Sequence, residues 1–318
     1  MAADRLADPS CALGGRLGHR NGSRKSPDQE AGRKADGQSQ NEQYEERHGL
    51  KGVETGNVSV IASVKTHPAV LPRRRERELS PTGVLRSRDG RVSERLGGLV
   101  DGHPVVAFLL VMFAGLLVIA ALSILLGLLV THVVEAGGIG AADERVNVWL
   151  AAHRTPTRTD ASLLGSIVAG GVVLPIVAGI LALVAALFRK WTLVAFFIFT
   201  LAVESATYRA TTLVVHSHRP RVHRLESLPV NASYPSGHTA AAIAVYGGLA
   251  LLITSHFRDR AVRIVTWLLA VGMVAFVATA RMYRGMHHPL DVAGGVVVGV
   301  AALCVLVLAC RSAEAAAE

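Results

Sequence analysis

Cysteine and aromatic residues are scarce in this sequence. The 318 residues include three cysteines, and aromatic residues make up only 5%. Cys304 and Cys310 share one apolar segment, but a spacing of six residues places them on different faces of a helix, so no disulfide bond between them is expected. Cys11 lies far from both in the sequence. The cysteines therefore provide neither a disulfide framework nor a cysteine-based metal site.

Charge is also missing where a soluble protein would have it. The first 100 residues hold 31 of the 57 Asp, Glu, Lys and Arg residues, and no charged residue occurs from Gly102 to Val134. A soluble domain spreads charge over its whole surface, so this distribution excludes an ordinary soluble globular protein. The second part of the chain has the composition of a membrane domain.

Two further signals are absent. The first 100 residues contain no apolar segment typical of a signal peptide, so none is expected. The formal charge of +9 raises the question of nucleic-acid binding, but no basic stripe interleaved with aromatic residues accompanies it. We therefore predict that the positive charge meets membrane surfaces and phosphate groups, and that nucleic acid is not a partner.

The sequence predicts three regions. Residues 1–100 are rich in Gly, Ser, Arg, Glu, Asp and Gln and have no sustained apolar period, which predicts a disordered tail. Residues 101–312 form the predicted membrane domain, and residues 313–318 a short C-terminal tail. We predict an all-α fold with a bundle of six transmembrane helices, which span approximately 105–134, 163–188, 191–215, 239–255, 264–280 and 289–310.

The basic loops predict the orientation. Arg189 and Lys190 join the second and third spans, and residues 256–263 join the fourth and fifth, so these loops and the N-terminal tail are expected to be cytoplasmic. Residues 216–238 and 281–288 would then lie on the other face, although both are rich in Arg. A bound anion would explain these arginines. We expect a multi-pass protein of the plasma membrane whose site faces away from the cytoplasm.

The first Arg-rich loop contains two elements that suit phosphate chemistry. Arg219 closes the third span, and arginine binds phosphate in bidentate geometry, although an interfacial arginine near lipid headgroups would look the same. Ser236 and Gly237 open the fourth span, where backbone N–H groups and the helix dipole favour an anion. His238 follows, either as a proton donor and acceptor or as an interfacial histidine behind a helix cap.

The third element consists of Arg281, His287 and Asp291. Pro289 suits the first turn of a helix, so the Asp291 carboxylate is expected one turn after His287, within reach of its ring. A carboxylate on one imidazole nitrogen fixes the tautomer and leaves the other nitrogen as a nucleophile. Asp291 could also cap the sixth span, and that role is compatible with the first.

Histidines are frequent in these loops, which raises the possibility of a metal site. The histidines concerned are His216, His218, His223, His287 and His288. None forms a helical pair with a carboxylate except His287 with Asp291, so we predict no bound metal and no cofactor.

The order RP, then PSGH, then R-x5-H-x3-D resembles the signature of the type 2 phosphatidic acid phosphatase (PAP2) and haloperoxidase superfamily. The resemblance extends over about residues 105–310 and implies a six-helix membrane bundle of the PAP2 type. It implies that His287 attacks phosphorus and forms a phosphohistidine, with Asp291 orienting its ring. It also implies that His238 protonates the leaving group and then activates the water that releases phosphate.

The resemblance also implies how the phosphoryl group is held. Arg219, Arg281 and the backbone around Ser236 and Gly237 would bind its oxygens, and no metal is required. The sequence departs from the family pattern at two positions. The third motif usually begins with Ser-Arg, and here it is Ala280-Arg281.

The other departure from the family pattern is the absence of the positively charged residue that usually opens the first motif. The first motif usually begins with a Lys seven residues before the Arg, where this chain has Thr212. Arg209 lies one helical turn from Thr212 on the same face, and we consider it as the missing cation. Pairing of Arg209 with Glu204 inside the bundle is the alternative, because helix side chains lean towards the N-terminus and so away from the site. Other candidates are Arg221, Arg224 and Arg284.

The resemblance implies an integral membrane lipid phosphatase. Its substrate would be a lipid phosphomonoester or pyrophosphate, such as phosphatidic acid, phosphatidylglycerol phosphate, or a polyprenyl phosphate or diphosphate. A lipid phosphotransferase would use the same site with an alcohol in place of water. A non-catalytic lipid-binding or transport protein with a degenerate site is a third hypothesis, motivated by Thr212. The sequence leaves the lipid and the oligomeric state open.

Overall fold

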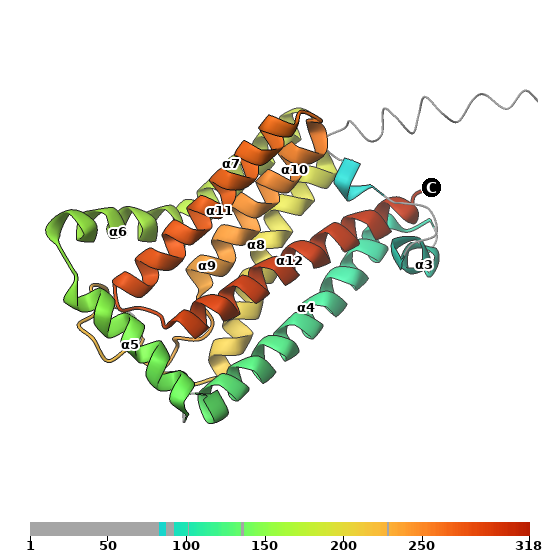
Figure 1. The fold of residues 1–318 in the computed structure, drawn as a ribbon. Coiled ribbons are helices and arrows are strands. Elements are labelled where there is room, and N and C mark those ends of the chain that lie inside the picture. Colours follow the sequence, from blue (N-terminus) through green and yellow to red (C-terminus); the bar gives the residue numbers. More distant parts are fainter. Residues whose placement is uncertain (1–82, 87–91, 101, 135–136, 228) are drawn as a thin grey trace, which may run out of the picture. The chain divides into compact units, whose positions relative to one another are not determined.

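The computed structural model describes residues 83–86, 92–100, 102–134, 137–227 and 229–318 (Figure 1). Residues 1–82, where most of the predicted disordered tail lies, are outside these ranges. Every regular element in the described residues is a helix, and one isolated bridge pairs Ser217 with Ala232. The predicted all-α class is therefore confirmed.

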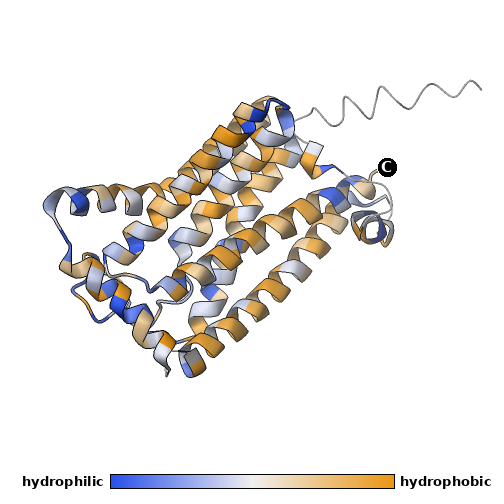
Figure 2. Ribbon diagram, viewed as in Figure 1, coloured by the Kyte–Doolittle hydropathy of each residue, from blue (hydrophilic) through white to orange (hydrophobic). Residues whose placement is uncertain are grey.

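In the part of the chain that the structure describes, five helices are long and apolar enough to cross a membrane. Figure 2 shows them hydrophobic along most of their length, with hydrophilic residues gathered towards the loops. One of the five is continuous through a π-helical segment, as α9 (Gly237–Ala242), η3 (Ile243–Gly247) and α10 (Gly248–His256). The others are α4 (Pro104–Leu129) with η2 (Val130–Val134), α8 (Trp191–Val214), α11 (Arg260–Tyr283) and α12 (Pro289–Ala315).

The second predicted span, 163–188, is broken. It consists of α6 (Pro156–Val168) and α7 (Val173–Leu187), whose axes differ by 45°. Gly170 and Gly171 lie at the break, where glycine disfavours a continuous helix. The 15 residues of α7 reach only about 22 Å, which is less than the hydrocarbon thickness, so α7 alone is too short to cross a membrane. The predicted six spans are obtained when this bent pair counts as one.

Residues 135–162, predicted as a loop between the first two spans, contain a further helix besides the start of α6. This is α5 (Gly138–Ala152), which packs against α11 and α12 (Figure 1). Its sequence mixes charged and apolar residues, so hydropathy alone gives no span there.

Packing against the helices begins before the predicted tail boundary at residue 100. The segment η1 (Gly83–Leu85) places the Leu85 side chain in the core between α10 and α12, and Arg311 Nε donates a hydrogen bond to Val84 O at 2.8 Å. The short helix α3 (Val92–Gly98) packs against the same end of α12. Two adjacent apolar residues, Val84 and Leu85, give no periodic signal, so the sequence pattern could not reveal this contact.

Glycines on α12 bring α9 close enough to build the site. A Cβ at Gly295 would lie 2.5 Å from Ser236 O, and one at Gly299 would lie 2.7 Å from Ala240 O. Side chains at these positions would push the two helices apart, so the small residues permit backbone contact. The start of α9 consequently lies against the start of α12.

Candidate active site

The turn between α11 and α12 carries His287. Gly285 has a φ of +70°, a backbone conformation that favours glycine and lets the chain reverse there. The backbone N–H of Ser236 donates to Asp291 O at 2.9 Å, which joins the start of α9 to this turn. The structure therefore brings the second and third sequence motifs together, although 49 residues separate His238 from His287.

His287 is buried, with one ring nitrogen already paired. Its Nδ1 lies 2.8 Å from the backbone carbonyl oxygen of Ser233. A carbonyl only accepts, so Nδ1 must carry the proton and Nε2 retains its lone pair. Burial lowers the pKa of His287, and the nearby Asp291 carboxylate opposes this only in part. The ring is thus the neutral imidazole that a nucleophilic role requires.

Asp291 lies beside this ring but bonds to other groups. Its Oδ2 is 3.8 Å from His287 Nδ1, which is longer than a hydrogen bond. The same oxygen accepts from Ser233 Oγ at 2.5 Å and from the backbone N–H of His288 at 2.8 Å, so Asp291 caps α12. Ser233, which sequence reasoning missed, contacts both residues and fixes the His287 tautomer. No motif or periodicity marks it in the loop.

Arg281 is fully buried and has unpaired donors. Its Nη1 donates to Ser166 Oγ at 2.8 Å and to Glu226 Oε2 at 2.7 Å. Its Nε and Nη2 have no hydrogen-bond partner among the described residues. A buried donor left unpaired is costly, and a guanidinium edge with two open N–H groups matches the oxygens of a phosphoryl group. Arg281 is therefore poised for an oxyanion.

Arg219, the other predicted phosphate ligand, is largely engaged by the backbone. Its Nε donates to Pro229 O and its Nη2 to Ala232 O, both at 2.8 Å, and its Nη1 donates to Met286 O. Burial lowers the pKa of this arginine. Three of its five N–H groups thus hold the loop against the α11–α12 turn, and two are left for a ligand.

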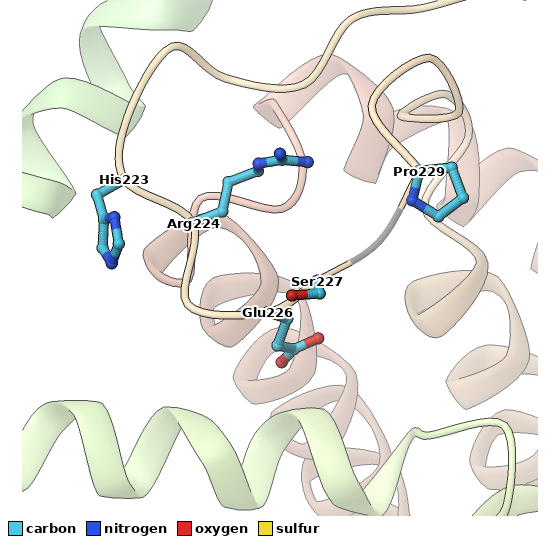
Figure 3. Close-up of a pocket in the computed structure, with 5 residues that line it drawn as sticks. All are labelled: His223, Arg224, Glu226, Ser227 and Pro229. Carbon is cyan, nitrogen blue, oxygen red and sulfur yellow. The ribbon is translucent and has the colours of Figure 1, made fainter.

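Glu226, which sequence reasoning also missed, pairs with two arginines. Its carboxylate accepts from Arg281 and, at 2.5 Å, from Arg284 Nε. Burial alone would raise the pKa of this carboxyl, but the charge of Arg281 and the hydrogen bonds from Arg281, Ser166 and Arg284 lower it to about 2. Glu226 also lines a pocket of about 560 Å³ with four other residues of its loop. Figure 3 shows Arg224 extending across this pocket between His223 and Pro229.

The Glu226→Gln variant is expected to be less stable than the wild-type protein near neutral pH, with the difference narrowing in acid. The pKa of Glu226 is lowered from 4.5 to about 2 on folding, so its stabilisation is fully present above about pH 4.5 and is lost as the pH falls towards 2. Melting temperatures in detergent between about pH 7 and pH 3 test this. A difference in melting temperature between the two proteins that stayed constant over that range would contradict this prediction.

The start of α9 places the residues of the second motif. Ser236 is fully buried, and its Oγ lies 3.0 Å from Thr239 Oγ1. The Ser236 N–H already donates to Asp291 O. The N–H groups expected to bind an anion here must therefore belong to the residues after Ser236. His238 is partly exposed, and the Arg281 guanidinium and the His287 ring lie near it.

Arg209 is not brought to the site. Its side chain is exposed, whereas the buried face of α8 carries Glu204, Thr207 and Thr211. Glu204 accepts from Ser205 Oγ at 3.1 Å, and no ion pair between Glu204 and Arg209 occurs in the part of the chain that the structure describes. Tyr208 faces the site instead, with its ring 3.2 Å from where a Cβ at Gly237 would lie.

The chain is similar to known proteins in sequence. Residues 193–313 match the model of the PAP2 superfamily. Over 75 residues the chain is 39% identical to a protein of Sulfolobus acidocaldarius named undecaprenyl-diphosphatase. That match covers 24% of this chain and 32% of the relative, so the chain spans about a third of the length of the curated relative it matches.

Two solved structures are similar in fold. The PAP2 type phosphatidylglycerolphosphate phosphatase of Bacillus subtilis has a TM-score of 0.50 at 20% identity, covering 64% of this chain and 94% of its own. The LpxE protein of Aquifex aeolicus has a TM-score of 0.40 at 22% identity, covering 51% of this chain and 93% of its own. The first likeness confirms the fold predicted from the sequence.

The family match contains every motif residue of the site, from Arg219 through His238 and Arg281 to His287 and Asp291. The apolar helices around it make the chain a multi-pass membrane protein. The segment from residue 193 to residue 313, which carries the whole site, is thus similar to the PAP2 superfamily.

Proposed function

We propose that this protein is a membrane lipid phosphatase that cleaves a phosphomonoester or pyrophosphate through a phosphohistidine. The observation that carries the proposal is the buried Arg281 guanidinium, with Nε and Nη2 unpaired among the described residues. It lies in the same site as His287, whose Nδ1 is committed to the Ser233 carbonyl. A cation with open donors beside a neutral nucleophile is the arrangement that phosphoryl transfer needs.

The reaction would proceed in two steps. The lone pair of His287 Nε2 attacks phosphorus, the bond to the leaving oxygen breaks, and His238 gives that oxygen a proton. His238 then takes a proton from water, whose oxygen attacks the phosphohistidine and releases inorganic phosphate. Arg281, the two remaining N–H groups of Arg219 and the N–H groups at the start of α9 would hold the phosphoryl oxygens. This chemistry needs no metal or cofactor.

Among lipid phosphates, a polyprenyl diphosphate is our first choice of substrate. The relative with 39% identity is named undecaprenyl-diphosphatase, which supports this choice. We also propose that the site faces away from the cytoplasm of the plasma membrane. The loop with Arg189 and Lys190 and the basic segment 256–263 support this orientation, since short basic loops favour the cytoplasmic side.

Phosphate release from a panel of lipid phosphates, with EDTA present, tests the proposed function. Purified full-length protein in detergent is expected to release phosphate from at least one of phosphatidic acid, phosphatidylglycerol phosphate, a polyprenyl phosphate and a polyprenyl diphosphate. The diphosphate is expected to give the highest kcat/KM. Absence of release from every lipid would contradict the proposal, and activity lost to EDTA would point to a metal-dependent reaction instead.

A further inference from the structure

The inner face of α5 contacts the turn that carries His287. Asn147 is fully buried, and its Nδ2 donates to Met282 O at 3.2 Å and to His287 O at 2.9 Å. Met282 lies near the end of α11, and His287 comes shortly before α12 begins. One side chain therefore joins both sides of the turn, across about 140 residues of sequence.

Two acidic residues one turn earlier on α5 contact the same region. Asp143 Oδ1 accepts from the backbone N–H of Leu290 at 3.1 Å, and Glu144 Oε2 accepts from His288 Nε2 at 3.0 Å. Asp143 lies four residues and Glu144 three residues before Asn147, and both spacings put a side chain on the helix face of Asn147. These contacts hold the residues that follow His287, while Asn147 holds the main chain of His287 itself.

The chemistry at Asn147 requires an amide. Both of its partners are carbonyl oxygens, which only accept, so the side chain there must offer two N–H groups from one atom. Aspartate has the same size but offers only acceptors when ionised, and alanine offers nothing. The His287 ring is held by the Ser233 carbonyl. The nucleophile is thus fixed through its side chain by one loop and through its main chain by α5.

We propose that Asn147 is a positioning residue for the His287 nucleophile, acting through the His287 carbonyl. The proposal rests on the proposed function, because it concerns the same reaction. His287 lies in a turn, where helix hydrogen bonds do not fix its main chain, so a tertiary bond has to do so. A displacement of about 1 Å at a reacting atom can lower a rate about 100-fold, which makes this bond important for the chemical step.

The test compares Asn147→Ala and Asn147→Asp with the wild-type protein, all full length and in detergent. Three quantities are measured: kcat and KM on the lipid phosphate that the wild-type protein hydrolyses best, the single-turnover rate of phosphoenzyme formation, and the melting temperature. We expect kcat and the single-turnover rate to fall about 10- to 100-fold, while KM stays within about twofold. Val148→Ala, on the exposed side of the same helix, is the control and is expected to keep wild-type kinetics.

The outcomes separate this proposal from the one it rests on. A wild-type protein that releases no phosphate contradicts the proposed function. An active wild-type protein together with folded Asn147 variants of unchanged kcat overturns the positioning role. A rise in KM alone, or a loss explained entirely by a smaller folded fraction, overturns it as well. If Asn147→Ala does not fold, Asn147→Asp decides, because it keeps the volume of the side chain and replaces the donor group with an acceptor oxygen.

Discussion

The His287→Ala variant is expected to lose phosphate release almost completely, with turnover at least about 1,000-fold below that of the wild-type protein. Alanine removes the proposed nucleophile, and a water molecule cannot replace it, because His238 is the proposed proton donor, and not a base, in the first step. The fold should survive, since Asp291 keeps its bonds from Ser233 Oγ and His288 N–H. Phosphate release and trapping of the acid-labile phosphoenzyme are the measurements.

The neighbouring histidine provides the control for this variant. His288 bonds to Glu144 through Nε2 and does not share the Ser233 carbonyl with His287. His288→Gln keeps a side-chain donor and is expected to form the phosphoenzyme. A phosphoenzyme that still formed in His287→Ala, or that vanished equally in both variants, would show that the nucleophile is another group.

The Arg281→Lys variant is expected to lower kcat/KM about 100- to 1,000-fold, the range found when a donor to a developing oxyanion is removed. Lysine keeps the positive charge but cannot present the two open N–H groups of the guanidinium edge. It also has to pair with Glu226 from a different position, so the ammonium is drawn away from the phosphoryl oxygens. Initial rates over a range of lipid phosphate concentrations give kcat/KM.

Arg209 offers a matched comparison with Arg281. Arg209→Ala removes a positive charge from the same protein, but from an exposed position on α8 outside the site. We expect its turnover to equal that of the wild-type protein, which would discard the hypothesis that Arg209 replaces the missing motif lysine. A large loss of turnover in Arg209→Ala would give Arg209 the role of the missing lysine. An unchanged kcat/KM in Arg281→Lys would contradict the role given to Arg281.

The transmembrane helices were predictable because each must be apolar along its own length, which is a local property of the sequence. The break between α6 and α7 was not predictable, since glycines such as Gly170 and Gly171 also occur inside continuous helices. The motif residues His238 and His287 were identified together because the two loops that lead to them were predicted on the same face of the bundle. Ser233, Glu226 and Asn147 were missed because each acts through a partner distant in sequence, and no periodic pattern marks such a contact.

The position of Asp291 shows a finer limit of sequence reasoning. A spacing of four residues predicted that its carboxylate would reach the His287 ring, and it does lie beside the ring, at 3.8 Å. The Asp291 carboxylate instead accepts hydrogen bonds from Ser233 Oγ and from the backbone N–H of His288. Spacing along a helix fixes where a side chain starts, whereas its bonding partner depends on which donors the tertiary fold brings nearby.

The open N–H groups of Arg281 also affect how the protein behaves outside catalysis. A buried guanidinium edge of this kind does not distinguish a lipid phosphate from a small tetrahedral anion of similar size. Any anion that binds the folded protein and not the unfolded chain stabilises the fold in proportion to the logarithm of its concentration. Orthophosphate or sulfate in a purification buffer would therefore protect the solubilised protein, while competing with the lipid in every assay.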